Sequence, residues 1–565
     1  MTWAKRRAIV IIILAVFFVV LVIVASKPTA LRLPSNGVLV MDLMGQIDEQ
    51  RAPDIFSAFS GTTVPVLHDY VDAIDSAAND SRITGLVVRI APLQTGWGKL
   101  EEIRAHLLRF HKSGKPSICY LGYDGIGNPE YYLASACEQI WLVPTAPVSI
   151  RGMMAEALFL RGTLDKLKVV PEFYHIAEYK TAGNMFTEKK FTPAHKEEVE
   201  GLLHSIYEQY LSDTSKARGM SPAQFEALLN QGPFSSKDAV AKKIVDRLGY
   251  WDQLQSYFRK QGRGWNPISL NRYRPFIKNE GRSEIAVVHA TGLIVSGDSG
   301  TTPGGGFVMG GDSVASDLRE ARLDSDIKAI VLRVDSGGGS VVGSEVIRRE
   351  VELANYVKPV VVSMSDVAAS GGYWIASPAR KIVADRDTIT GSIGVIIGKL
   401  NISGLYNLLG ISTDYVATSD NATLFSDQQN FSPTQRAYIE KSLNETYADF
   451  TKGVAAGRKM PVEAVDKVGK GRVWSGAQAK QLGLVDELGG LDRAVEIAKQ
   501  LSHIPENEPV RIVRYPVEKT FFEQLLEREK DNNLSESQSL ESVVRHVVSQ
   551  MEPVQARMPY ELHIR

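Results

Sequence analysis

Hydrophobic positions along the chain follow two alternating patterns. Short aliphatic runs typical of buried strands are separated by stretches in which apolar residues recur every three or four positions, as in amphipathic helices. The first half of the chain contains predicted strands at residues 38–43, 85–90, 117–120 and 139–143, and a predicted helix at 101–110. The second half contains predicted strands at 285–289, 329–334, 359–364 and 381–384. This alternation predicts α/β domains with largely parallel sheets.

The two halves are also repeats of one another. Residues 131–135 (YYLAS) match residues 373–377 (YWIAS), about 242 positions later. Three further matches keep the same order along the chain, namely 80–83 with 324–327, 115–116 with 358–359, and 243–246 with 483–486. Four collinear matches predict a tandem duplication of one α/β domain.

The predicted organisation follows from these patterns and from a length of 565 residues, which exceeds the size that one hydrophobic core supports. The region between the repeats is rich in Gly, Pro, Asn and Arg, and the chain after Lys519 becomes charged and polar, with one amphipathic stretch at 540–551. The predicted segments are a basic N-terminus (1–7), a transmembrane anchor (8–25), a first α/β domain (36–261), a linker (262–282), a second α/β domain (283–516), and a helical or mobile tail (517–565).

The anchor prediction depends on an unbroken apolar run of 18 residues at 8–25, preceded by Lys5, Arg6 and Arg7. At about 1.5 Å per residue, a helix of this length just spans a hydrocarbon core of roughly 30 Å. The basic flank predicts a cytoplasmic N-terminus, with the chain after Lys27 on the other side of the membrane. A cleavable signal peptide is the alternative, although its apolar region is usually shorter than this one.

Composition bears on three questions, namely whether the chain binds nucleic acid, whether its cysteines pair and whether it binds a metal. Lys and Arg total 64 against 65 Asp and Glu, so no excess positive charge favours nucleic acid as a partner. Cys119 and Cys137 are the two cysteines. An extracytoplasmic compartment would permit them to pair, but we expect two buried free thiols, because the sequence cannot establish disulfide geometry. So few thiols, without a His-Glu-x-x-His motif, predict no metal site.

Two glycine-rich motifs in the second half could support catalysis. Residues 335–340 (DSGGGS) follow a predicted strand, and their glycines could present backbone N–H groups to an oxyanion. A phosphate loop would require a Gly-Lys-Ser/Thr ending, which this motif lacks, while an ordinary turn remains an alternative.

Ser370-Gly371-Gly372 lies at the start of a predicted helix, where the N-terminus favours negative charge. Ser370 is therefore a candidate nucleophile, although helix packing or an N-cap is an equally simple explanation.

A nucleophilic serine needs a base, and the second half lacks the usual one, because all ten histidines lie outside residues 290–502. In the first half, residues 178–181 (EYKT) contain Lys180, whereas the aligned residues 419–422 (SDNA) have no lysine. Conversely, the first half has no serine at the position that aligns with Ser370. This complementary loss predicts one serine-lysine site shared by both halves, with burial lowering the lysine pKa. His175 is the alternative base.

These residues resemble the long, duplicated, membrane-anchored form of signal peptide peptidase A, of the Ser-Lys protease family S49. The resemblance extends over residues 37–516 and is most specific at 369–373 (ASGGY), 390–394 (TGSIG) and 179–182 (YKTA). It implies a fold related to crotonase and to the caseinolytic protease subunit. It also implies roles for Ser370 as the nucleophile, Lys180 as the general base, Ser392 as the residue that orients the lysine, and Gly338 and Gly371 as the oxyanion hole. One departure is Gly337, where the family usually has proline, and this change is expected to loosen the turn.

The resemblance further implies a serine endopeptidase that needs no cofactor and degrades hydrophobic peptides such as cleaved signal peptides. It implies a homo-oligomer, with a tetramer as one candidate size, held at the bacterial inner membrane with its catalytic domains on the periplasmic side. Two other functions remain open at this stage. A crotonase-type acyl-CoA enzyme would share the fold, and a non-catalytic membrane scaffold would share the anchor.

Overall fold

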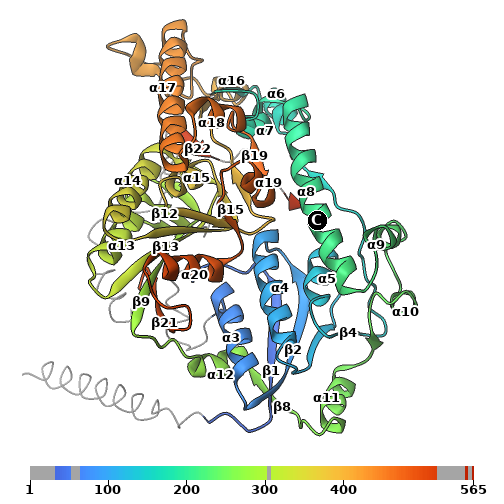
Figure 1. Ribbon diagram of the computed structural model, residues 1–565. Coiled ribbons are helices and arrows are strands. Elements are labelled where there is room, and N and C mark those ends of the chain that lie inside the picture. Colours follow the sequence, from blue (N-terminus) through green and yellow to red (C-terminus); the bar gives the residue numbers. More distant parts are fainter. Residues whose placement is uncertain (1–31, 52–63, 302–306, 518–553, 558–562, 565) are drawn as a thin grey trace, which may run out of the picture.

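The computed structural model describes residues 32–51, 64–301, 307–517, 554–557 and 563–564 (Figure 1). The predicted anchor at 8–25 and the predicted amphipathic stretch at 540–551 lie outside these residues. Within the described part of the chain, no helix has the length and apolar character needed to cross a membrane.

The first repeat forms a parallel sheet in the order β7-β4-β3-β2-β1-β8, with helices packed against it (Figure 1). Its central strands are β1 (Gly37–Gly45), β2 (Ile83–Leu93), β3 (Ser117–Leu121) and β4 (Gln139–Leu142), and its edges are β7 (Arg247–Leu248) and β8 (Asn266–Ser269). Three of its helices are α3 (Leu67–Asn79), α4 (Trp97–His111) and α5 (Asn128–Ala134). All four predicted strands of the first half are confirmed.

The second repeat builds the same arrangement. Its main sheet has the order β19-β17-β15-β13-β9-β21, and β16 pairs with β15 alongside β17. The strands are β9 (Ser283–Thr291), β13 (Ile327–Ser336), β15 (Val360–Ala369), β16 (Lys381–Ala384), β17 (Ile389–Gly391), β19 (Val473–Ser475) and β21 (Val510–Tyr515). The four predicted strands of this half are confirmed as β9, β13, β15 and β16, and their order matches β1, β2, β3 and β4. The α/β class and the duplication are therefore properties of the fold.

A third sheet combines both repeats. Its order is β11-β12-β10-β14-β22-β18-β6. The strands are β11 (Gly300–Thr301), β12 (Phe307–Gly310), β10 (Leu293–Val295), β14 (Gly338–Ser340), β22 (Val554–Arg557), β18 (Ile396–Asn401) and β6 (Val170–His175). Strand β6 belongs to the first repeat and pairs antiparallel with β18 of the second, with His175 opposite Ile396. This pairing brings the segment that follows β6 into the second repeat.

The predicted linker at 262–282 is wrong in part. Its residues 266–269 form β8, which pairs parallel with β1, and its residues 270–273 form the short helix α12 (Leu270–Tyr273). Ile268 and Tyr273 are fully buried in the first domain. The sequence pattern did not reveal this structure because β8 is an edge strand in which only Ile268 faces the core.

The tail is also corrected where the structure describes it. Residues 554–557 form β22, and β23 (His563–Ile564) pairs antiparallel with β5 (Ala155–Glu156) of the first repeat. These are strands, whereas a helical or mobile tail was expected for residues 517–565. Their partners are distant in sequence, so no local pattern could predict the pairing.

The expectation of free thiols is wrong. Cys119 in β3 and Cys137, just before β4, form a disulfide, with their Cα atoms 5.8 Å apart. This distance lies in the normal range for a disulfide. Helix α5 connects these neighbouring parallel strands, and its C-terminal turn returns the chain beside β3.

The two repeats share a buried, charged interface. Arg333 on β13 is completely buried, and its guanidinium pairs with Glu102 at 2.7 Å and with Glu49 at 2.8 Å, both from the first repeat. Lys99 on α4 similarly crosses to the second repeat, where its Nζ lies 2.6 Å from Asp335 and 3.0 Å from Asp366. Because Asp335 is the next-to-last residue of β13, the strand that leads to the glycine turn, this interface also positions the candidate site.

We expect Lys99→Met to destabilise the chain strongly. The substitution leaves the Asp335 and Asp366 carboxylates without their cation, and breaking a buried ion pair from one side typically costs about 3–5 kcal/mol. The urea midpoint should fall accordingly, while the matched change Lys112→Met, at the exposed lysine that directly follows the same helix, should have little effect. Equal midpoints for the two variants would contradict the assigned importance of this pair.

Candidate active site

Ser370 lies at a strained junction between a strand and a helix. Strand β15 ends at Ala369, and α15 (Gly371–Ala376) begins directly after the serine. The backbone of Ser370 has φ 56° and ψ −116°, a left-handed conformation that is rare for a residue with a side chain. Such strain costs of the order of 1–3 kcal/mol and concentrates at functional sites. The N–H of Ser370 donates to the Gly391 carbonyl at 2.9 Å, which helps to hold this conformation.

Lys180 reaches Ser370 from the other repeat. It follows β6, and its Nζ lies 2.7 Å from Ser370 Oγ. The same Nζ lies 3.1 Å from Ser392 Oγ and 3.1 Å from the Ser392 carbonyl oxygen. Lys180, Ser370 and Ser392 each have 0 % exposed surface. The structure therefore brings together, within one chain, the lysine and the two serines that the sequence singled out.

Burial changes the protonation of this lysine. Removal of the ammonium group from water lowers the pKa of Lys180 to about 7, while the Glu198 carboxylate acts weakly in the opposite direction. Glu198 Oε2 accepts a hydrogen bond from the backbone N–H of Val473 at 2.9 Å, so part of its charge is already satisfied. A large fraction of Lys180 is consequently an uncharged amine near neutral pH, able to accept a proton.

Ser392 is fixed in place to contact the lysine. It follows β17, has a left-handed φ of 49°, and its N–H donates to the Arg472 carbonyl at 2.7 Å. Gly471 packs against Lys180 on the same side, because a Cβ at Gly471 would lie 2.4–2.6 Å from the Lys180 N, Cα and Cβ atoms. Only glycine fits there. Neither Gly471 nor Glu198 was predicted as a site residue, because no periodicity or repeat match in the sequence marks them.

The predicted oxyanion glycines lie on two segments that are in contact. Gly371 opens α15, and a Cβ on the next residue, Gly372, would lie 2.4 Å from the Ser336 carbonyl, so this helix packs directly on the glycine turn. Gly338 has φ 96°, and its N–H donates to Ser336 Oγ at 3.1 Å. To bind an oxyanion, the Gly338 N–H must either donate to the oxyanion and to Ser336 Oγ together or give up its hydrogen bond to Ser336 Oγ.

The turn is held by a serine rather than by a proline. Ser336 Oγ accepts from Gly338 N–H and donates to the Gly292 carbonyl at 2.6 Å. These two hydrogen bonds connect the turn to the end of β9. These hydrogen bonds therefore oppose the loosening of the turn that was expected from Gly337 in the place of proline.

His175, the alternative base, is placed differently. It lies on β6, is exposed, and its Nδ1 is 2.7 Å from the Ala177 carbonyl oxygen. Lys180, by contrast, contacts Ser370 Oγ directly. The geometry favours the lysine.

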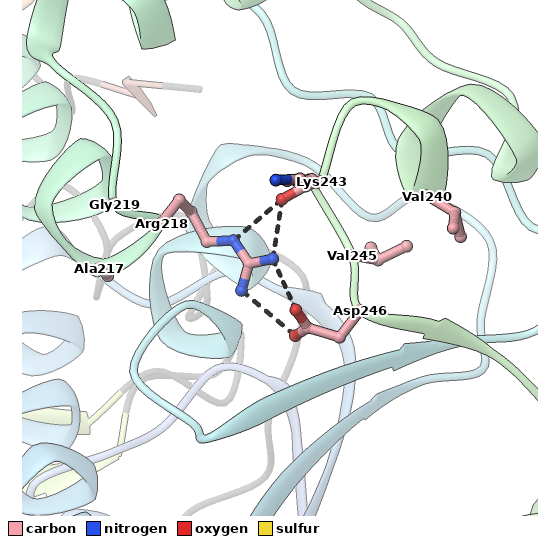
Figure 2. Close-up of a pocket in the computed structure, with 7 residues that line it drawn as sticks. All are labelled: Ala217, Arg218, Gly219, Val240, Lys243, Val245 and Asp246. Carbon is pink, nitrogen blue, oxygen red and sulfur yellow. Dashed lines mark hydrogen bonds and ion pairs between the residues drawn. The ribbon is translucent and has the colours of Figure 1, made fainter.

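The surface pocket in Figure 2 is lined by residues that we interpret as structural and not as catalytic. Its volume is about 470 Å³, and the ion pair between Arg218 and Asp246 crosses it at 2.9 Å (Figure 2). The second repeat has the equivalent pair, Arg458 with Asp486 at 2.6 Å. In each repeat the aspartate also accepts a hydrogen bond from a backbone N–H of an earlier strand, β4 in the first repeat and β16 in the second. Because both copies retain this pair, we interpret it as an anchor for the strand and not as a catalytic group.

A second polar cluster connects the repeats away from Ser370. Asp75, His106 and Asp492 have the spacing of a possible metal site among the residues that the structure describes. Arg109, however, inserts its guanidinium between the two carboxylates, 3.2 Å from Asp75 and 2.5 Å from Asp492. A cation is thus already supplied by the protein, and we interpret the cluster as an ion pair network.

Comparison with known proteins places these residues in context. The family model described as "Peptidase family S49" matches residues 109–263 and 352–505, one segment in each repeat. The chain is 33 % identical to "Serine protease SPPA, chloroplastic" of Arabidopsis thaliana, over 93 % of this chain and 78 % of that protein. It is 36 % identical to "Protease 4" of Salmonella typhi, over 84 % of this chain and 79 % of that protein. Among solved structures, a ClpP1 mutant of Listeria monocytogenes aligns with 37 % of this chain and 94 % of its own, at 14 % identity and a TM-score of 0.24.

Proposed function

Because the chain belongs to peptidase family S49 and is a serine endopeptidase, we propose that Ser370 is its nucleophile and Lys180 its general base. One observation carries this proposal, namely the 2.7 Å contact between a fully buried amine from the first repeat and a fully buried hydroxyl from the second. A pKa of about 7 makes that amine a base at neutral pH.

The reaction proceeds by acyl transfer. The uncharged Lys180 amine takes the proton of Ser370 as its Oγ attacks the peptide carbonyl, and a tetrahedral intermediate forms. Protonated Lys180 then gives the proton to the leaving amine as the carbon–nitrogen bond breaks. Water, activated by the same amine, hydrolyses the acyl-enzyme and restores both side chains. Ser392 holds Nζ in position through these steps.

The oxyanion is stabilised by backbone N–H groups. We assign this role to Gly338 and Gly371, which lie on the two segments that meet beside Ser370. One such donor is typically worth about 10²–10³ in kcat. In the free enzyme the Gly338 N–H donates to Ser336 Oγ. If it donates to the charged oxyanion in the transition state instead, its hydrogen bond becomes stronger there than in the free enzyme.

The proposed substrates are hydrophobic peptides, with cleaved signal peptides as the main class. The apolar run at 8–25 supports this assignment, because an anchor at the bacterial inner membrane would hold the periplasmic domains beside such peptides. A homo-oligomer, with a tetramer as one candidate size, would enclose the sites. An acyl-CoA enzyme is disfavoured because its acid–base carboxylates are replaced here by an amine and hydroxyls.

A synthetic signal peptide tests this function. We expect the purified chain to cut the peptide within its apolar segment, with products identified by mass spectrometry, and we expect no products from Ser370→Ala. An intact signal peptide, together with cleavage of polar peptides by the same sample, would contradict the substrate class. Equal cleavage by Ser370→Ala would contradict the nucleophile.

A further inference from the structure

A buried carboxylate lies close to the proposed base. Glu198, on α8 (Pro193–Ala217) of the first repeat, is 1 % exposed. Helix α8 contacts β19 of the second repeat, so this glutamate lies where the two repeats meet (Figure 1). A carboxylate that is removed from water needs hydrogen bonds or a cation to offset the loss of hydration. The groups around Glu198 therefore indicate what its charge does.

One carboxylate oxygen holds the segment behind Ser392. Glu198 Oε2 accepts a hydrogen bond from the Val473 N–H at 2.9 Å. The carbonyl of the preceding residue, Arg472, accepts the Ser392 N–H at 2.7 Å. Ser392 in turn places its Oγ 3.1 Å from Lys180 Nζ. Glu198 therefore helps to fix the serine that orients the lysine.

The other carboxylate oxygen faces the segment that carries the lysine. Thr181 directly follows Lys180, and its hydroxyl lies 3.5 Å from Glu198 Oε1. All three residues are buried, and charges interact more strongly there than in water. Burial lowers the pKa of Lys180 to about 7, and the Glu198 carboxylate acts against this by raising it. The basicity of Lys180 is thus a balance between burial and this carboxylate.

The charged and titratable groups around Glu198 come from three elements. Lys180 faces it from the segment after β6, Arg472 lies on the turn before β19, and His195 lies one turn earlier on α8. The Arg472 guanidinium pairs with Glu197 at 2.8 Å. Burial lowers the pKa of His195 to about 4, so this ring is uncharged near neutral pH. Lys180 is therefore the neighbour whose charge changes during the proposed reaction.

The second repeat has no carboxylate at the equivalent position. Residues 191–193 (FTP) match residues 431–433 (FSP), and α8 and α17 (Pro433–Arg458) begin at the matching prolines. This match places Tyr438 opposite Glu198, and Tyr438 is 55 % exposed. The buried carboxylate thus occurs in the repeat that retains the lysine, and an exposed tyrosine replaces it in the repeat that lacks the lysine.

We propose that Glu198 is a positioning residue of the serine–lysine site, whose carboxylate fixes the segments that carry Lys180 and Ser392 and stabilises the ammonium formed when Lys180 takes the Ser370 proton. The inference rests on the proposed function, since it takes Lys180 as the base. In that step the proton moves from Ser370 Oγ to Lys180 Nζ, the bond from Oγ to the carbonyl carbon forms, and negative charge moves to the carbonyl oxygen. Backbone N–H groups stabilise the negative charge, and Glu198 offsets the cost of the positive one.

The pH dependence of covalent labelling tests this role. The rate at which a fluorophosphonate labels Ser370 is measured from pH 5 to pH 10 in the full wild-type chain, in Glu198→Gln and in Glu197→Gln. Glutamine keeps the shape of Glu198 and an oxygen that can accept the Val473 N–H, but it carries no charge. Glu197 is the matched control, because it is the adjacent carboxylate on the same helix and its side chain is 57 % exposed.

Glu198→Gln should move the midpoint to lower pH by about half a unit or more, because the Lys180 ammonium loses the carboxylate that stabilises it. Its plateau rate should fall about twofold or more, since a weaker base takes the serine proton less readily. Glu197→Gln should keep the wild-type midpoint. A glutamate with a purely structural role would lower the rate without moving the midpoint, so an unshifted midpoint in Glu198→Gln would overturn the proposal.

Urea midpoints at pH 6 and pH 9 give a second readout, which can be followed even in a chain that is much less stable than wild type. The decrease caused by Glu198→Gln should be larger at pH 6, where Lys180 is mostly charged, than at pH 9. In the Lys180→Met background the decreases at the two pH values should be equal. Equal decreases in both backgrounds would overturn the proposal.

The labelling experiment also separates this inference from the proposed function. A wild-type chain without a midpoint near pH 7 would contradict Lys180 as the base and, with it, the role of Glu198. A wild-type midpoint near pH 7 that Glu198→Gln leaves unchanged would contradict the role of Glu198 alone.

Discussion

Replacement of Lys180 by methionine should lower kcat by about 10⁴-fold or more. Methionine fills a similar volume but cannot accept a proton, and loss of the base or nucleophile from a serine protease site removes roughly 10⁴–10⁶ of the rate. Ser370→Ala should cause a similar loss, and the double variant should be no worse than either single one, because the two groups act in one step. Lys190→Met, at an exposed lysine ten residues away, provides the matched control.

Stability distinguishes loss of chemistry from loss of fold. The unfolded chain keeps the Lys180 proton up to a pKa of about 10.5, whereas the folded chain releases it near 7. The folded wild type therefore binds fewer protons than the unfolded chain between these values, and its stability rises with pH in that window. Lys180→Met should lack this contribution while remaining folded. Substantial activity in a folded Lys180→Met chain would contradict the assignment of the base.

Chains that each lack one member of the pair should fail to rescue one another. Lys180 and Ser370 meet within one chain, so a mixture of Lys180→Met and Ser370→Ala chains contains no complete site. We expect co-expressed chains, purified through a different tag on each, to remain about 10³-fold or more below wild type. Wild type co-purified with a chain that carries both substitutions is the control for the procedure. Recovery of a quarter or more of the wild-type rate would show that neighbouring chains exchange these residues.

Much of the fold was accessible from the sequence because its central strands are buried on both faces. Runs such as residues 329–334 are apolar except for Arg333, as expected in parallel sheets covered by helices, and they coincide with observed strands. The pairing of Lys180 with Ser370 was accessible for a different reason. Duplication gave each residue a counterpart, and complementary loss indicated which residue each repeat retained.

The remaining structure depends on contacts between distant segments. Strand β14 consists of two glycines and a serine, so it has no apolar pattern, and β22 gains its partners only from the folded third sheet. The contact of Gly471 with Lys180 likewise arises from packing between the repeats. The disulfide depended on a distance between a strand and a turn that neither local sequence determines.

The central claim is that an uncharged Lys180 activates Ser370, and the pH dependence of covalent labelling tests it most directly. The rate at which a fluorophosphonate labels Ser370 should be measured from pH 5 to pH 10 in wild type and in Lys180→Met, with the labelled residue identified by mass spectrometry. For wild type, the rate should reach half its maximum near pH 7, because only the deprotonated amine accepts the serine proton, and it should fall about fifty-fold between pH 7 and pH 5. Labelling of Lys180→Met should be far slower at every pH and should lack this midpoint. The same rate and the same midpoint in both chains would contradict the account.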